Sequence, residues 1–139
     1  MKQTAVNSFF DSNIIVYCYS KTEPDKQKKV FGIIDNCKFL FISSQVLHEF
    51  CNVAHKNFHA DDIDVNFALA EIERLFYIHP NSINTVRKAN NIKHKHKFSF
   101  YDSLIVAAAL ECNCKILYSE DLQHKQIIEN SLTIINPFK

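Results

Sequence analysis

Short apolar runs alternate with segments of helical spacing along this chain, and this alternation is the feature that most limits how it can fold. No Asn-Gly or Asp-Gly pair marks a tight hairpin between neighbouring strands. The pattern therefore predicts an α/β fold with a central parallel sheet of about four to five short strands and helices on both faces. The expected strands cover residues 7–10, 39–42, 77–79, 116–118 and 132–135.

The segments between these strands carry apolar residues at the spacing of one helical face. Residues 104–110 are apolar without interruption, so we expect their helix to be the central, buried one. A loop with a short helix is expected over residues 122–129. The other predicted helices cover residues 14–19, 30–34, 44–58, 63–75 and 82–92.

Length, charge and cysteine usage set broad limits. With 139 residues, the chain is expected to form a single domain over residues 1–139. Its 16 basic and 15 acidic residues produce no net field towards a polyanion, so nucleic acid would have to be held locally. Five cysteines, an odd number, favour reduced thiols, and we find no signal-peptide pattern. We therefore expect a cytoplasmic protein.

Glycine is almost absent from the chain. Gly32 is the only one, where average usage predicts roughly ten. Gly-rich loops that hold phosphates need several glycines close together. The composition therefore excludes Walker-type and Rossmann-type nucleotide binding.

Four carboxylates lie at the ends or edges of apolar runs: Asp11, Glu49, Asp102 and Asp121. A buried charge costs several kcal/mol unless it is paired or binds a metal, so these positions favour one shared explanation. Asp11 and Asp121 each follow the carboxyl end of a predicted strand, where parallel sheets bind ligands. Oxygen ligands without cysteine or histidine suit Mg²⁺ or Mn²⁺. The sequence therefore predicts a divalent-cation site.

Each acid also has an ordinary structural interpretation. Asp11 could cap the first helix, Asp102 could pair with Ser99 in a helix cap, and Asp121 could be a turn residue. Glu49 falls at the edge of the apolar stripe of its helix, so it could be a surface charge or face the rim of a cleft. The shared metal site is distinguished from these separate roles only if the topology brings all four acids to one edge of the sheet.

These residues together resemble the PIN domains, and most closely the VapC-type toxins of prokaryotic toxin–antitoxin pairs. The resemblance extends from about residue 9 to residue 138 and implies a PIN-like fold. It is carried by residues 10–14, Glu49, residues 99–109 and residues 118–124.

The resemblance implies a Mg²⁺- or Mn²⁺-dependent endoribonuclease. A catalytically silent PIN-like module that binds RNA or protein is the alternative function. The acids would both hold the metal and act in catalysis, with Glu120 as an alternative to its neighbour, and two polar residues would support them. The implied ligands are Asp11, Glu49, Asp102 and Asp121, and the supporting residues are Asn13 and Ser119.

Two positions depart from the family pattern. Lys125 stands where relatives often carry glycine, and glycine there would let a backbone approach closely. Asn113 replaces the glycine usual before the following strand, a change that the left-handed cap of a helix tolerates. The first departure puts the geometry near His124 in doubt.

Substrate contacts are expected from basic residues near the acids. Lys93, Lys95 and Lys97 could hold phosphates, or they could be a solvated helix end. His124 could contact phosphate or have only a structural role in its loop. Lys26 and its helical neighbours are expected to face solvent.

An apolar content of 47% with twelve phenylalanines favours an exposed apolar patch. Similar toxins form homodimers and are inhibited by an antitoxin protein whose tail packs in a hydrophobic groove. We expect both partners here, in addition to an RNA substrate. Candidate groove residues, for which core packing is the alternative, are Phe31, Ile34, Phe67 and Phe76.

Overall fold

The computed structural model describes residues 4–139, so residues 1–3 of the expected single domain lie outside the described part. The strands are β1 (Thr4–Phe10), β2 (Cys37–Ser43), β3 (Tyr77–His79), β4 (Ile116–Tyr118), β5 (Ile127–Ile128) and β6 (Leu132–Ile135). The helices are α1 (Ser12–Tyr17), α2 (Pro24–Asn36), α3 (Ser44–Lys56), α4 (Asp62–Leu75), α5 (Ile83–His96) and α6 (Phe100–Glu111). All six strands belong to one sheet in the order β3-β2-β1-β4-β6-β5.

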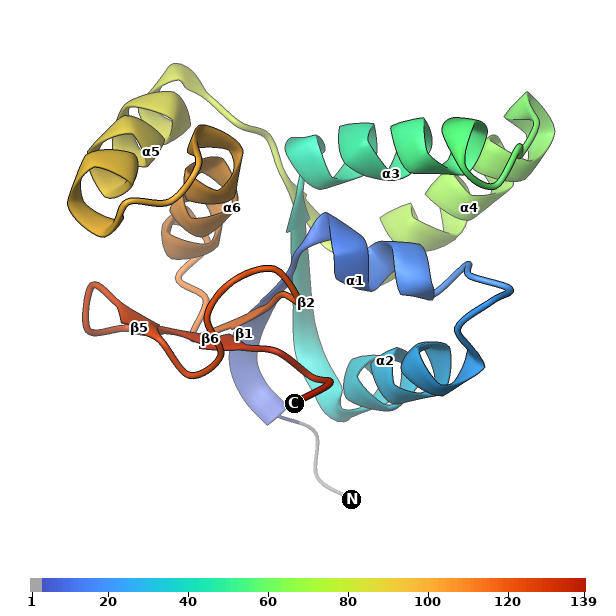
Figure 1. The fold of residues 1–139 in the computed structure, drawn as a ribbon, viewed down its shortest axis with the longest axis horizontal. Coiled ribbons are helices and arrows are strands. Elements are labelled where there is room, and N and C mark those ends of the chain that lie inside the picture. Colours follow the sequence, from blue (N-terminus) through green and yellow to red (C-terminus); the bar gives the residue numbers. More distant parts are fainter. Residues whose placement is uncertain (1–3) are drawn as a thin grey trace.

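Helices cover both faces of the sheet, as the sequence predicts (Figure 1). The chain moves from β1 to β2 to β3 in one direction and then crosses back to β4 beside β1. Right-handed crossovers therefore put helices α1 to α4 on one face and helices α5 and α6 on the other. The reversal between β1 and β4 is the kind of position where open α/β sheets bind ligands.

The pairing of β1 with β4 brings two distant segments of the chain together. The strands are parallel, and Phe10 lies opposite Tyr118. The backbone N–H of Asp11 continues this pairing by donating to the Tyr118 carbonyl at 3.0 Å. The residues that follow the two strands, Asp11 and Ser119, are therefore neighbours at one edge of the sheet.

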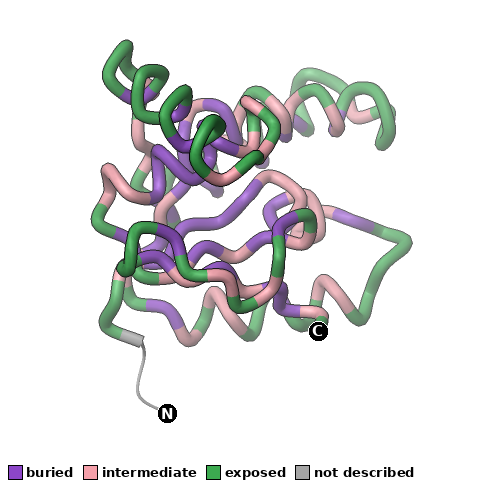
Figure 2. The backbone as a smooth tube through the Cα atoms, turned by 60° about the vertical axis from the view of Figure 1, so that its left-hand side comes forward, coloured by how far each residue is buried: buried purple, intermediate pink, exposed green. Residues whose placement is uncertain are grey.

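Helix α6 is buried between the sheet and α5, which confirms the expectation of a central apolar helix. Residues 103–109 are all buried, and the buried segments gather at the centre of the molecule in Figure 2. The helix begins at Phe100 because the Ser99 hydroxyl accepts from the Asp102 N–H at 3.1 Å. Every helix among residues 4–139 is too short or too polar to span a lipid bilayer.

The segment after β4 differs from the prediction. Residues 122–129 contain no helix, and β5 instead pairs with β6 in an antiparallel hairpin. Glu129 and Asn130 both have positive φ, 51° and 56°, and Ser131 N–H donates to the Ile128 carbonyl at 3.1 Å. This turn usually carries Asn-Gly, so a sequence without that pair gave no hairpin signal.

All positive φ angles among residues 4–139 belong to residues other than glycine. Asn113, at 55°, takes the left-handed cap of α6 as expected. Lys125 has a φ of 70°, a left-handed backbone conformation that glycine adopts without strain and lysine does not. Gly32, by contrast, lies inside α2 and needs no special conformation.

Replacement of Gly32 by alanine is therefore expected to stabilise the protein. Gly32 is exposed, and an added Cβ would meet no atom within 4 Å. Alanine has less conformational freedom to lose in a helix, so Gly32→Ala should raise the free energy of unfolding by about 1 kcal/mol. Urea denaturation measures this change. An unchanged or lower value would contradict the assignment of Gly32 to an unstrained helix interior.

Candidate active site

Asp11 is the most buried acid at the carboxyl edge of the sheet, with 4% of its surface exposed. It follows β1 and caps α1, because its Oδ1 accepts from the Ser12 N–H at 2.7 Å. The Ser119 hydroxyl, at the end of β4, donates to Asp11 Oδ2 at 2.8 Å. The helix-cap role and the shared site are therefore compatible in this residue.

Burial raises the pKa of Asp11 to about 6, against an ordinary value of 3.8. The hydrogen bonds from Ser119 and Ser12 oppose this rise but do not cancel it. The negative charges of Glu49 and Asp102 raise the pKa further. Asp11 therefore interacts electrostatically with two other acids of the predicted set, Glu49 and Asp102.

Glu49 projects from α3 and is partly buried, with its Oε1 atom inaccessible to solvent and without a hydrogen-bond partner. Burial raises the pKa of Glu49, contacts with Ser12 and Gln45 oppose the rise, and the charges of Asp102 and Asp121 add to it. A buried carboxylate oxygen without a partner is costly, so it favours a bound proton, water or cation at this position.

Asp102 lies in the first turn of α6 and is partly buried. Burial raises its pKa, the bond with Ser99 opposes the rise, and the charge of Asp121 adds to it. The Gln45 amide of α3 donates to the Tyr101 carbonyl at 3.1 Å. This hydrogen bond connects α3, which carries Glu49, with α6, which carries Asp102.

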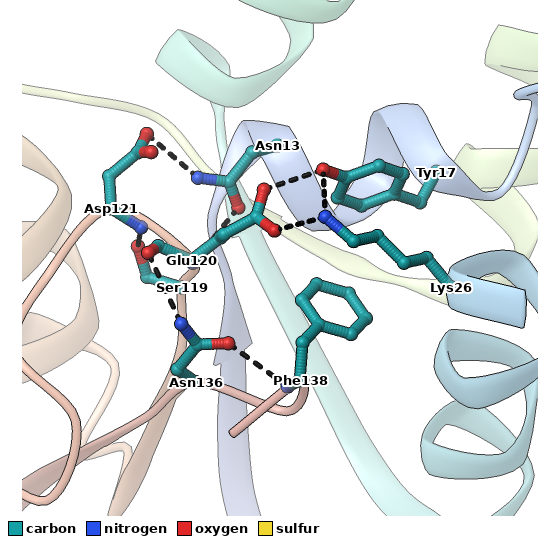
Figure 3. A network of polar contacts seen from close by, with 8 residues as sticks. All are labelled: Asn13, Tyr17, Lys26, Ser119, Glu120, Asp121, Asn136 and Phe138. Carbon is teal, nitrogen blue, oxygen red and sulfur yellow. Dashed lines mark hydrogen bonds and ion pairs between the residues drawn. The ribbon is translucent and has the colours of Figure 1, made fainter. Parts of the chain in front are cut away.

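Asp121 is exposed and is held by the two predicted supporting residues (Figure 3). Asn13 Nδ2 donates to Asp121 Oδ2 at 2.8 Å, and the Asp121 N–H donates to Ser119 Oγ at 3.2 Å. Ser119 therefore contacts both Asp11 and Asp121. The four acids come from four separate segments, and electrostatic interactions connect every one of them to at least two others.

Glu120 points away from this cluster. Its carboxylate accepts from the Tyr17 hydroxyl and from Lys26 Nζ, the latter at 2.6 Å. Burial alone would raise the pKa of Glu120, but these two bonds lower it below its ordinary value. Lys26 is thus not a purely solvated side chain, which corrects the sequence-based expectation. No motif links these residues, so no sequence signal pointed to Tyr17 or Lys26.

The donor chemistry fits a hard divalent cation, although the side chains do not enclose one. Within residues 4–139, no group of three or more Asp, Glu, His or Cys side chains is gathered tightly enough to hold a metal ion. The mutual repulsion of the acids and the unpartnered Glu49 Oε1 are nevertheless what a cation would relieve. Asp11, Glu49, Asp102 and Asp121 offer only oxygen, the donor that Mg²⁺ and Mn²⁺ prefer.

The basic candidates lie at the end of α5 and in the loop after β4. Lys93, Lys95 and Lys97 are exposed, and Lys95 forms an ion pair with Glu129 at 2.9 Å. His124 Nδ1 accepts from the Asn136 N–H at 3.0 Å, so a neutral His124 carries its proton on Nε2. These contacts give His124 a structural role in its loop, and phosphate binding by all four residues stays a prediction.

A hydrophobic groove lies between α1, α2 and α4. The cavity has a volume of about 490 Å³. Phe31, Ile34 and Phe76 line it, as expected, whereas Phe67 lies outside it. Phe76 is buried in the core, but Phe31 and Phe67 are 45% and 69% exposed, so core packing does not account for them.

Comparisons with known proteins agree with this architecture. The family model of the PIN domain matches residues 8–130, so the chain belongs to the PIN domain family. No curated protein sequence matches the chain.

Solved structures with the same fold include toxins and toxin–antitoxin complexes. A toxin–antitoxin complex from Klebsiella pneumoniae matches with a TM-score of 0.72 and 18% identity, over 96% of this chain and 99% of that one. VapC20 of Mycobacterium tuberculosis, a toxin that cleaves the sarcin-ricin loop, matches with a TM-score of 0.64 and 12% identity, over 80% and 87%. VapBC2 of Rickettsia felis, bound to promoter DNA, matches with a TM-score of 0.63 and 18% identity, over 91% and 96%.

The burial of Asp11 predicts an unusual pH dependence of stability in the absence of divalent cations. The unfolded carboxyl group has the ordinary pKa of 3.8, and the folded one has a pKa of about 6. Folding therefore favours the protonated form of Asp11. The free energy of unfolding of the protein falls as the pH rises between these two pKa values. Asp11→Asn removes the ionisable group and should raise the free energy of unfolding at pH 7 by up to about 3 kcal/mol.

Urea denaturation in EDTA measures this difference at several pH values. The gain from Asp11→Asn should be largest at pH 7 and should shrink as the pH falls towards 4. A gain that is equal at both pH values, or a loss at pH 7 only, would contradict a raised pKa for Asp11.

Proposed function

We propose that this chain is a Mg²⁺- or Mn²⁺-dependent endoribonuclease and the toxin of a prokaryotic toxin–antitoxin pair. The observation that carries the proposal is the position of the four carboxylates, which come from separate segments, with Ser119 bonded to both Asp11 and Asp121. The direction of the pKa shifts of Asp11, Glu49 and Asp102 agrees with it. Membership of the PIN domain family and the shared fold with VapC20, a toxin that cleaves the sarcin-ricin loop, support it.

In this proposal the acids hold the cation that is needed to hydrolyse a phosphodiester bond of RNA. A bound divalent cation lowers the pKa of water and neutralises the phosphate that bare carboxylates would repel. Asp11 and Glu49 contribute the most buried oxygens, and Ser119 and Asn13 keep Asp11 and Asp121 in place. Asp102 or Asp121, both less buried than Asp11, accepts the proton from the attacking water.

RNA binding would use the exposed lysines at the end of α5, Lys93, Lys95 and Lys97, together with His124. The Nε2–H of a neutral His124 is the atom available to a phosphate oxygen, because Nδ1 is engaged by Asn136. The near balance of charge in the whole chain leaves this local group as the source of phosphate attraction.

The partners that we propose are a cognate antitoxin and a second copy of the chain, in the cytoplasm. Two of the similar structures are toxin–antitoxin assemblies. The groove between α1, α2 and α4 offers an apolar surface for the antitoxin tail. Glu71 lines the same groove, so a basic residue among the apolar residues of that tail would be favoured there.

The main test is cleavage of pooled RNA in the presence of Mn²⁺. The wild-type chain should cut RNA with Mn²⁺ or Mg²⁺ and lose this activity in EDTA. Asp11→Asn should lower the rate at least about a hundredfold while the protein stays folded, because a central oxygen ligand is lost. Gly32→Ala is the control variant: it lies on α2, which carries none of the four acids, and its added Cβ would meet no atom within 4 Å, so it should keep full activity.

Three outcomes would contradict the proposal in different ways. Cleavage that persists in EDTA, or in folded Asp11→Asn, would exclude the metal mechanism. RNA binding without cleavage under all metal conditions would favour the catalytically silent module.

The antitoxin groove is tested by two exposed phenylalanines, of which one lines the groove and the other lies outside it. Phe31→Asp places a charge in the groove and should weaken binding of a small antitoxin protein co-expressed with the chain, by about tenfold or more. Phe67→Asp, outside the groove on α4, should bind as the wild type does. Calorimetry on the purified pair measures both. Equal effects of the two substitutions would contradict the assignment of the groove.

A further inference from the structure

A fifth carboxylate, Glu120, lies between Ser119 and Asp121 but takes no part in the acid cluster. Lys26 Nζ donates to Glu120 Oε2 at 2.6 Å and to the Tyr17 hydroxyl oxygen at 3.1 Å. The Tyr17 hydroxyl in turn donates to Glu120 Oε1. Figure 3 shows the Glu120 side chain directed to these two residues and the Asp121 side chain directed away from them. Both oxygens of Glu120 are therefore engaged on the side of α1 and α2.

Lys26 is itself held in place. Its ammonium group lies 4.9 Å from the centre of the Tyr17 ring and 5.0 Å from the centre of the Phe138 ring. The two rings contact each other edge to face at 5.3 Å. A lysine already held by two aromatic rings and a hydroxyl loses little further freedom when it binds Glu120.

The backbone of Glu120 is fixed from two further directions. Asn136 Nδ2 donates to the Glu120 carbonyl at 3.3 Å, and the Glu120 N–H donates to Asn13 Oδ1 at 3.4 Å. Asn13 also donates to Asp121. Asn13 and Tyr17 lie four residues apart on α1 and therefore on one face of it, so one helix face orients both acids.

We propose that Lys26 and Tyr17 are positioning residues, which withdraw Glu120 from the acid cluster and so leave Asp121 as its fourth member. This inference rests on the proposed function for its catalytic meaning. Glu120 and Asp121 are adjacent in the sequence, and both follow the end of β4. The hydrogen bonds of Glu120 decide between them, because they commit one carboxylate to Lys26 and leave the other beside Asn13 and Ser119.

The test uses Lys26→Met, with Lys28→Met as the matched control on an exposed position of the same helix. In metal-free protein, the side-chain amide resonances of Asn13 report its bond to Asp121. Lys26→Met should shift these resonances, whereas Lys28→Met should not. Lys26→Met should also weaken Mn²⁺ binding in calorimetry by about tenfold and lower kcat by about tenfold with little change in KM.

Two further variants separate positioning from a purely structural role. Lys26→Arg keeps the positive charge and should retain Mn²⁺ affinity close to that of the wild type. Adding Glu120→Gln to Lys26→Met removes the released carboxylate and should bring Mn²⁺ affinity back towards the wild-type value. A merely structural role for Lys26 would allow neither result.

The inference is overturned if Lys26→Met leaves the Asn13 resonances and Mn²⁺ affinity unchanged, or if Lys28→Met alters them equally. It is also overturned if the added Glu120→Gln lowers Mn²⁺ affinity further. Failure of the wild-type chain to bind Mn²⁺ or cleave RNA would instead refute the proposed function, and the Asn13 resonances would still decide whether Lys26 positions Asp121.

Discussion

The burial of one carboxylate, Asp11, is the constraint on which the rest of the site depends. Its position follows from the parallel pairing of β1 with β4, which ends with the bond from Asp11 N–H to the Tyr118 carbonyl. Ser119 and Ser12 each donate to one oxygen of Asp11, and the group still has a raised pKa because burial outweighs both bonds. The charged form of this carboxylate is destabilised by burial, so a nearby positive charge would stabilise it.

The other acids reach this carboxylate through helices that the topology brings to the same edge. Glu49 is carried by α3 on one face of the sheet, and Asp102 is carried by the buried helix α6 on the other. The apolar surface of α6 fixes the helix in the core, and its first turn presents Asp102 at the rim. Packing of apolar side chains thus contributes the free energy that keeps mutually repelling acids near each other.

The features that the sequence predicted are those with a local signal. Apolar segments identify most strands, and Asn113 is a residue that accepts a left-handed cap. Asp11, Asp102 and Asp121 follow a strand or lie in the first turn of a helix, and the order of these elements implies one edge. The missed features depend on contacts through space or on unusual residues. The β5–β6 turn uses Glu129 and Asn130 in place of Asn-Gly, and Lys26 meets Glu120 across 94 positions of the chain. Neither the turn nor the ion pair corresponds to a short sequence pattern from which it could be predicted.

The most direct test of the proposed cation site is a crystal structure of the wild-type chain with Mn²⁺, recorded at a wavelength where manganese scatters anomalously. We expect a strong anomalous peak among the carboxylates of Asp11, Glu49 and Asp102, with Asp121 turned towards it and Glu120 still bonded to Lys26. A peak at another place on the chain, or none at saturating Mn²⁺, would contradict it.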